Sequence, residues 1–428
     1  MTAYRDFTRE ELLAEHRTQT AALDAWKAKG LALNMARGKP SPEQLATSLP
    51  MLDALGSDAD LIAEDGTDAR NYGCLQGLPE ARRLMAALLH SPAEHIIICG
   101  ESSLNAEYDA LARFFLFGTD GHAPWSTCEE VRWLCPVPGY DRHFAMAEAF
   151  GMTLVPVALT PEGPDLDEVE RLVADERVKG IWCVPQYANP DGCTYSDEVV
   201  ERLATMRCAA PDFRIFWDNA YAVHHLRFDG HSAHVADIGS ACEEAGNPRR
   251  YLKFASTSKI TFPGAGLAAV AGSAETVAEI LGHMRFQTIG HDKLNQLRHV
   301  AFLRDEAGLM AHMRTLAALI APKFALVQEM LHDGLDEADI ATWTDPAGGY
   351  FVFFRSMPGC AKRIVELAKE AGVTLTKAGA TWPYGVDPYD TDIRIAPTYP
   401  DIDELRAALG IFVVCVKIAS CERLLAQQ

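Results

Sequence analysis

A single lysine, Lys259, lies in a turn whose residue types suit a reactive amine beside an anion-binding site. The surrounding stretch, Phe254 to Gly266, is typical of a strand that ends in a turn, because a Pro-Gly pair follows the lysine closely. Two hydroxyl groups, those of Ser256 and Ser258, come just before the lysine. The stretch is consistent with an amine nucleophile next to a phosphate site. The alternative is a solvated surface lysine in a polar loop.

Other polar residues recur where apolar, strand-like segments end. In chain order they are Glu101-Ser102-Ser103, Tyr140, Asn189-Pro190-Asp191-Gly192, Asp218-Asn219-Ala220-Tyr221, Ser256-Thr257-Ser258-Lys259 and Arg394-Ile395-Ala396-Pro397. In open α/β sheets, ligands bind beyond the carboxyl ends of the strands. We therefore expect these side chains to converge on one site, although each residue taken alone is also typical of a turn, a helix cap or the core.

The elements that must position these residues alternate between strand and helix. Seven segments have the pattern of strands: 95–100, 132–136, 153–157, 181–185, 214–218, 251–256 and 266–271. Such alternation predicts an α/β fold with a mostly parallel seven-stranded sheet sandwiched by helices. We assign residues 51–318 to this large domain.

The C-terminal part of the chain has a different pattern. After about residue 318 we expect a long helix, a strand over 348–353, a helix over 361–371, a strand over 392–396 and a final helix. Near the N-terminus, Thr8 and Glu11 form a capping-box pattern that predicts a leading helix. Residues 1–50 and 319–428 are therefore predicted to form a smaller α+β domain.

The order and spacing of the polar segments resemble those of the class I aminotransferases of pyridoxal-phosphate fold type I, in particular an aspartate-aminotransferase-like bacterial branch. The resemblance runs from about residue 30 to the C-terminus. It implies the cofactor pyridoxal 5′-phosphate, with Lys259 as the Schiff-base lysine and proton carrier. It also implies that Asp218 pairs with the pyridinium nitrogen, so that the ring can act as an electron sink, and that Tyr221 donates to the ring oxygen.

The resemblance assigns further residues to the cofactor and the substrate. Cofactor contacts are implied for Ser102, Ser103, Tyr140, Asn189, Ser256, Ser258 and, from a neighbouring subunit, Tyr72. Substrate contacts are implied for Arg394, Gly38, Asn189 and Arg298. In this scheme Arg394 binds the α-carboxylate as a two-pronged pair, and Arg298 of a partner subunit binds the distal carboxylate of dicarboxylic substrates. The alternative for Arg298 is a helix-surface arginine.

Two positions depart from the family pattern. The family commonly has a phosphate-binding arginine seven or eight residues after the lysine, where this chain has Gly266 and Leu267. Other groups must then balance the charge of the phosphate. Asp191 replaces the usual threonine between Pro190 and Gly192, which places an additional negative charge near the expected site.

Composition excludes several classes of protein. The 428 residues carry a formal net charge of -20, which disfavours nucleic-acid or anionic-membrane partners because both require a basic surface. The 11 cysteines form no Cys-x-x-Cys pair, so neither a metal site nor a disulfide framework is predicted. The N-terminus has no apolar run typical of a signal peptide. We expect a cytoplasmic protein.

The expected function is amino transfer by a homodimer whose active site lies at the subunit interface. An amino acid, aspartate or glutamate, would be the donor and a 2-oxo acid the acceptor, in a ping-pong reaction. Two alternatives remain open from the sequence. One is β-lyase or decarboxylase chemistry on the same fold, and the other is a non-catalytic ligand-sensing module.

Overall fold

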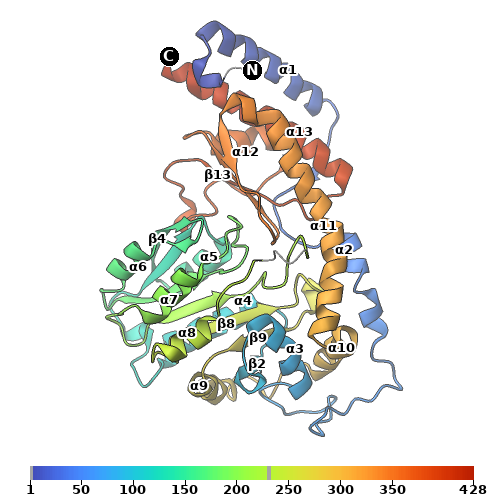
Figure 1. The fold of residues 1–428 in the computed structure, drawn as a ribbon, viewed down its shortest axis with the longest axis vertical. Coiled ribbons are helices and arrows are strands. Elements are labelled where there is room, and N and C mark those ends of the chain that lie inside the picture. Colours follow the sequence, from blue (N-terminus) through green and yellow to red (C-terminus); the bar gives the residue numbers. More distant parts are fainter. Residues whose placement is uncertain (1–2, 229–232) are drawn as a thin grey trace.

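The seven strands predicted for the large domain lie in one large sheet in the lower lobe of the molecule (Figure 1). In the computed structural model, which describes residues 3–228 and 233–428, this sheet has eight strands in the order β2-β9-β8-β7-β6-β3-β4-β5. Their bounds are β2 Ile96–Ile98, β3 Arg132–Val137, β4 Thr153–Thr160, β5 Gly163–Pro164, β6 Val178–Cys183, β7 Arg214–Asp218, β8 Tyr251–Ser256 and β9 Ala268–Ala271.

The sheet is mostly parallel, as predicted. Strands β4, β3, β6, β7 and β8 pair in parallel, whereas β9 runs antiparallel to both of its neighbours, β8 and β2. All seven predicted strands are present. The prediction missed the eighth strand, β5, a two-residue edge segment antiparallel to β4, because Gly163–Pro164 carries no apolar pattern.

Helices cover both faces of the sheet. Successive residues of a strand point to opposite faces, so Phe216 of β7 packs into one apolar core and its neighbours Ile215 and Trp217 into another. Residues of α4 (Ser103–Phe117), α5 (Asp141–Ala149) and α9 (Ala274–Met284) belong to the first core. Residues of α6 (Leu166–Leu172), α7 (Asp197–Thr205) and α8 (Ile238–Glu244) belong to the second. A further core, toward β2 and β9, includes residues of α3 (Pro79–Leu89) and α10 (Lys293–Leu303).

The upper lobe combines both ends of the chain, and the two termini lie close together there (Figure 1). Its elements are α1 Arg9–Lys27, β1 Leu33–Asn34, β10 Ala341–Trp343, β11 Val352–Ser356, α12 Ala361–Glu370, β12 Val373–Thr374, β13 Asp392–Ile395 and α13 Ile402–Gln427. Helix α2 Pro42–Ala46 lies lower, beside the long helix α11 and level with the large sheet (Figure 1). Strand β11 pairs antiparallel with β10 and β13, and β1 pairs in parallel with β12. The capping box at Thr8 and Glu11 is present, as predicted.

The predicted strand over 348–353 was placed too early. Strand β11 begins at Val352, because Gly348 and Gly349 form a turn pressed against the ring of Tyr187. Gly349 has φ of 83°, a conformation that favours glycine. A Cβ atom on Gly348 would lie 2.2 Å from the Tyr187 ring, so a side chain at this position would not fit.

A single helix, α11 (Glu306–Leu335), runs along both lobes (Figure 1). It begins twelve residues before the predicted start near 318, because the side chain of Asp305 caps it by accepting from the Gly308 amide. Its first half packs into the core near α3 and α10, and its second half, from Ile320, packs into the core of the upper lobe. The domain boundary at 318 falls within this helix and stays a prediction.

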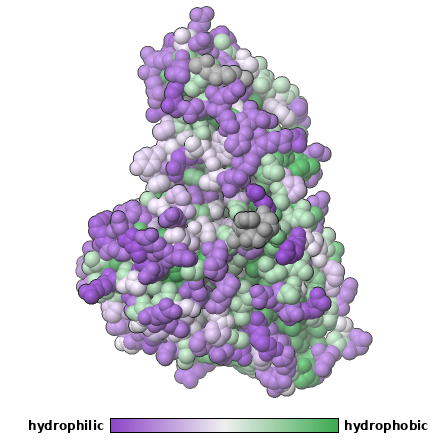
Figure 2. Space-filling view, in the orientation of Figure 1, coloured by the Kyte–Doolittle hydropathy of each residue, from purple (hydrophilic) through white to green (hydrophobic). Residues whose placement is uncertain are grey.

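By length and composition α11 could cross a membrane, but many of its large apolar side chains, such as Leu316 and Phe324, pack in the cores of the two lobes. The surface is consistent with the acidic composition, since Figure 2 shows hydrophilic residues over most of the face in view. Short 3-10 turns connect the elements at η1 Tyr4–Asp6, η2 Leu49–Asp53, η3 Ala93–His95, η4 Trp125–Thr127, η5 Pro263–Ala265, η6 Asp336–Ala338 and η7 Pro383–Gly385.

Candidate active site

The polar residues at the strand ends surround a cavity of about 520 Å³. The predicted residues that line it are Gly38, Ser102, Ser103, Tyr140, Asn189, Asp218, Tyr221, Ser256, Ser258, Lys259 and Arg394. They come from both lobes. Arg394 lies on β13 of the upper lobe, whereas Asp218 ends β7 and Lys259 follows β8 of the large sheet. Segments more than 350 residues apart in the chain, at Gly38 and Arg394, therefore meet in one site.

Lys259 is held in a tight turn after β8. Thr257 anchors this turn, since its amide donates to the Leu267 carbonyl at 2.8 Å and its carbonyl accepts from the amides of Ile260 and Thr261. The amine of Lys259 lies 4.8 Å from the ring centroid of Tyr221. Burial lowers the pKa of this amine, although the nearby carboxylates of Asp218 and Glu107 act in the opposite direction. A buried amine with a lowered pKa is suited to act as a nucleophile and a base.

Asp218 ends β7, and its side chain is 4 % exposed at the bottom of the cavity. Its Oδ2 lies 3.4 Å from Nε2 of His143. Its Oδ1 is buried and has no hydrogen-bond partner among the described residues. A buried carboxylate oxygen needs a donor, so Oδ1 is placed to accept a hydrogen bond from a ligand in the cavity.

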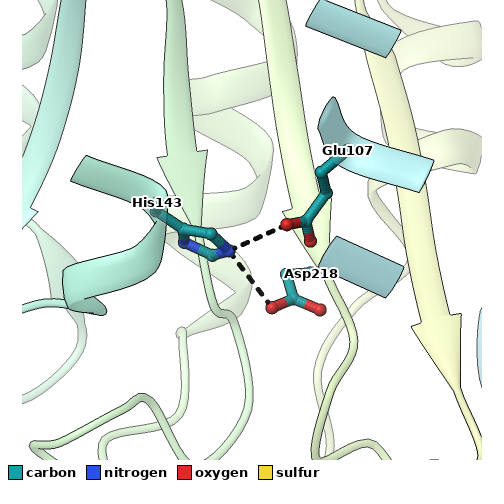
Figure 3. A group of neighbouring side chains, drawn as sticks. All are labelled: Glu107, His143 and Asp218. Atoms are coloured by element: carbon teal, nitrogen blue, oxygen red, sulfur yellow. Dashed lines mark ion pairs between the residues drawn. The ribbon is translucent and has the colours of Figure 1, made fainter. Parts of the chain in front are cut away.

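Two buried residues that adjoin Asp218, Glu107 and His143, were not predicted from the sequence. Figure 3 shows His143 of α5 between the carboxylates of Glu107 of α4 and Asp218. Nε2 of His143 lies 3.2 Å from Oε2 of Glu107, and the imidazole ring stacks on Trp182 at 4.3 Å between centroids. Burial alone would lower the pKa of His143, but the two carboxylates outweigh it and raise the pKa to about 9. His143 is therefore an imidazolium at neutral pH.

Four serine hydroxyls form the part of the cavity that suits a phosphate. Ser102 precedes α4, whose N-terminus offers unpaired amide groups and a favourable dipole for an anion. The Ser102 side chain does not cap the helix, so its hydroxyl is available to a ligand. Next to it, Ser256 donates to the Ser258 hydroxyl at 3.0 Å, and Ser258 donates to the carbonyl of Glu101, the residue before Ser102, at 3.3 Å.

The structure explains why no arginine stands at the family's usual position. A Cβ atom on Gly266 would lie 2.7 Å from the carbonyl oxygen of Glu101, so this position has no room for a side chain. The next residue, Leu267, is 1 % exposed and packs in the core. The described cavity lining nevertheless contains five basic side chains, Arg37, Lys39, Arg142, Lys259 and Arg394, and three acidic ones, Glu107, Asp141 and Asp218. The site is thus locally cationic in an acidic protein.

Arg394 of the upper lobe is anchored by three polar side chains. Its Nη1 donates to Oδ1 of Asp141 at 3.1 Å and to Oδ1 of Asn189 at 3.2 Å, and its Nη2 donates to the Thr376 hydroxyl at 3.4 Å. The guanidinium also lies 4.7 Å from the ring centroid of Phe351. A planar guanidinium held in this way can bind a carboxylate through two parallel hydrogen bonds.

Two further predicted residues line the cavity close to these groups. Tyr140 is the N-cap residue of α5, and burial raises the pKa of its hydroxyl. Gly38 packs against Phe351 so closely that a Cβ atom would lie 2.5 Å from the ring. By contrast, Asp191 lies outside the described lining, and its Oδ1 accepts from the Cys193 amide at 3.2 Å, as a turn residue does.

Two predicted residues lie apart from this cavity within the described chain. Tyr72 is 82 % exposed and lines a separate surface cavity formed by residues 69–73 and 289–294. Arg298 is part of α10, where its Nη2 donates to Oδ1 of Asn295 at 2.6 Å. Both had been expected to act at the active site of a partner subunit. Their positions within one chain do not test those roles, which stay predictions.

The chain is similar to known proteins over almost its whole length. The profile of the family described as aspartate amino-transferase matches residues 7–428. An aspartate aminotransferase of Corynebacterium glutamicum is 45 % identical over 98 % of this chain and 96 % of its own length.

Solved structures give the same result. The crystal structure of an aspartate transaminase from Corynebacterium glutamicum superposes with a TM-score of 0.96 at 44 % identity, covering 99 % of both chains. The α-aminoadipate aminotransferase of Thermus thermophilus, complexed with N-(5′-phosphopyridoxyl)-L-leucine, shares the fold with a TM-score of 0.73 at 21 % identity, over 94 % of this chain and 96 % of its own. This chain therefore belongs to the aspartate aminotransferase family, whose fold type I enzymes depend on pyridoxal 5′-phosphate.

Proposed function

We propose that this aminotransferase uses a dicarboxylic amino acid, aspartate or glutamate, as donor and a 2-oxo acid such as 2-oxoglutarate or oxaloacetate as acceptor. The observation that carries the proposal is one cavity that combines a buried amine, an unpartnered buried carboxylate oxygen and an anchored arginine, at Lys259, Asp218 and Arg394. The names of the aspartate aminotransferase relatives support the choice of donor.

The residues of the cavity fit pyridoxal 5′-phosphate. When bound, this cofactor supplies an electron-poor ring that stabilises negative charge at the α-carbon of the amino acid. Asp218 Oδ1 would accept a hydrogen bond from the protonated ring nitrogen, and the negative charge of the carboxylate would keep that nitrogen protonated. Ser102, Ser103, Ser256 and Ser258 would hold the phosphate.

The remaining residues would orient the reacting groups and move the proton. Burial holds the Tyr221 hydroxyl protonated, with a pKa well above its usual value, so it can donate to the ring oxygen together with the Asn189 amide. Arg394 would bind the α-carboxylate and fix the α-carbon close to Lys259. Lys259 Nζ would then act as the base that takes up, holds and passes on the proton of the α-carbon.

We further propose a cytoplasmic homodimer. Tyr72, Ile289 and Leu294 are large side chains with 82 %, 61 % and 40 % exposure that line one surface cavity. Exposed apolar groups around one depression are typical of a protein interface. Cover by a second copy of the chain would bury them, and this arrangement supports a role for Tyr72 at the partner's site.

Substrate choice can be tested at two arginines. If Arg298 of the partner binds the distal carboxylate, Arg298→Ala should lower kcat/KM for aspartate about 10- to 100-fold, because a charge-assisted pair is lost. Alanine, which has no distal carboxylate, should be affected far less. Steady-state kinetics with both amino acids measure this difference, and equal losses would refute the role.

Arg142 of the same subunit is the alternative residue for the distal carboxylate, since it lines the cavity next to Asp141. Its variant is therefore compared with Arg298→Ala. A selective loss of aspartate activity in Arg142→Ala, with Arg298→Ala behaving like the wild type, would place the distal carboxylate site inside the subunit.

The function as a whole is tested by a visible absorption spectrum of the purified protein, followed by a panel of amino acids with 2-oxoglutarate. We expect a yellow protein that forms glutamate fastest from aspartate. Absence of a chromophore after addition of pyridoxal 5′-phosphate would contradict the proposal. Release of pyruvate and ammonia from a single amino acid, without a need for a 2-oxo acid, would also contradict it.

A further inference from the structure

Glu107 is a buried glutamate of α4, and the proposed roles above make no use of it. It lies one turn after Ser103, so helical geometry places both residues on the same face, toward the cavity that they line. Its side chain is 1 % exposed. A fully buried carboxylate is rare unless it is paired, so the nature of its partner decides what it can do.

The cluster of Glu107, His143 and Asp218 contains one donor for two carboxylates. Nε2 of His143 lies 3.2 Å from a carboxylate oxygen of Glu107 and 3.4 Å from one of Asp218 (Figure 3). One ring nitrogen and one oxygen from each carboxylate all lie within 4.8 Å of one another. A ring N–H cannot donate a full hydrogen bond to both oxygens. Neither oxygen of Glu107 has a hydrogen bond of good geometry to the described residues.

The three side chains of the cluster do not balance in charge. Two carboxylates and one imidazolium carry a net negative charge in a buried place, which is unfavourable. Among the described residues, the other titratable groups near Glu107 are Lys259 after β8 and Tyr140 before α5. The Lys259 amine opposes the negative charge, but burial lowers its pKa and so weakens its hold on its proton.

Glu107 is the carboxylate that can relieve this imbalance by taking a proton. Burial, followed by the charge of Asp218, raises the pKa of Glu107 to about 7. His143 keeps its proton over the same range because its pKa is about 9. A cation bound at Asp218 Oδ1 would add the missing positive charge and make the anionic form of Glu107 favourable again.

We propose that Glu107 is the proton-exchanging residue of this cluster: its carboxyl group is protonated before the cofactor binds, and it loses that proton when the cationic ring N–H is bound by Asp218. The O–H bond of Glu107 breaks, and the proton passes to water through the cavity that Glu107 lines. No other bond changes. The imidazolium of His143 is then retained throughout, so the charge and orientation of Asp218 stay constant. This inference rests on the proposed site for the cofactor.

Infrared difference spectroscopy tests this proposal on the wild-type protein. The apoprotein at pH 6 is mixed with pyridoxamine 5′-phosphate, which carries the ring nitrogen, or with its 1-deaza analogue, in which a carbon replaces that nitrogen. We expect pyridoxamine 5′-phosphate to remove the carbonyl band of one protonated carboxyl group, and the deaza analogue to leave the band in place. Persistence of the band with the first probe, or its equal loss with both probes, would overturn the proposal.

Variants assign the proton to its residue. Glu107→Gln keeps the shape of the side chain, and it should lack the band. Selective nitrogen-15 labelling of histidine, with the His143 signal assigned from its loss in His143→Asn, reports the imidazole. Wild-type His143 should stay protonated from pH 6 to 8 with or without pyridoxamine 5′-phosphate. In Glu107→Gln its pKa should fall by one unit or more.

Loss of the His143 proton in the wild type on binding, or an unchanged His143 pKa in Glu107→Gln, would contradict the inference. A merely structural glutamate would alter thermal stability without moving either signal. If Glu107→Gln does not fold, the two probes on the wild-type protein still decide the question. If neither probe binds the wild type, the proposed cofactor site fails; if both bind and the band is unchanged, only the role of Glu107 fails.

Discussion

Replacing Lys259 by alanine should abolish transamination, with a loss of at least about 10⁴-fold in kcat. The reason is that the variant lacks the buried amine that faces both Asp218 and Tyr221, and with it both the nucleophile and the group that moves the α-proton. The rate of oxaloacetate formation from aspartate and 2-oxoglutarate measures the effect.

Two control variants test the cause of the loss. The first tests whether a positive charge at this position is enough for activity, and the second tests whether replacing any lysine lowers activity. Lys259→Arg keeps a cation but has no nucleophilic amine, and it should be as inactive as the alanine variant. Lys29→Ala removes an exposed lysine that lies on the Trp26 ring, at the end of α1, and it should retain wild-type turnover. Normal activity in Lys259→Ala would contradict the assignment of this cavity as the active site.

Asp218→Asn should lower kcat about 10²- to 10³-fold, the usual effect of removing one preorganised electrostatic partner from an active site. The amide has nearly the same shape, but it cannot stabilise a positive charge on the ring nitrogen. The rate of a single half-reaction with aspartate, measured by rapid mixing, reports this directly. Weaker binding of the cofactor should accompany the slower rate.

Asp212 offers a matched control, because it is also a buried aspartate but lies outside the described cavity lining. Its carboxylate accepts from the Lys179 amine and the Trp125 indole, each at 2.8 Å. Asp212→Asn should therefore reduce the free energy of unfolding while leaving turnover per folded molecule unchanged. If both aspartate variants show the same kcat, the special role of Asp218 is wrong.

The strands and the residues at their ends were the predictable part of the structure. Apolar segments such as 214–218 have a pattern that local physics makes clear, and parallel pairing then brings Asp218 and Lys259 to one edge of the sheet. The helix capped at Ser196 was predictable for a similar local reason, since its hydroxyl accepts from the Val199 amide.

Glu107 and His143 were not identified because both lie within helices, where charged residues usually face solvent. Only the packing of α4 and α5 on one face of the sheet turns both side chains toward Asp218. A usable signal was present, namely a glutamate one helical turn after Ser103 and a histidine three residues after Tyr140.

The remaining differences have tertiary causes. The contact of Gly348 with Tyr187 delays β11, and the space beside Gly266 is fixed by the Glu101 carbonyl, two effects that join segments distant in the sequence. The roles of Tyr72 and Arg298 depend on a second subunit, so neither the sequence nor the fold of one chain determines them.

The ion pair between Arg394 and Asp141 has a consequence for how a substrate enters. Under the role proposed for Arg394, the carboxylate of a substrate would meet a guanidinium that already donates to another carboxylate. Asp141 offsets part of the charge of the arginine before any substrate arrives, so the gain from the new pair would be smaller than for an arginine without a partner. Asp141 would thus lower the affinity for every carboxylate that binds at Arg394.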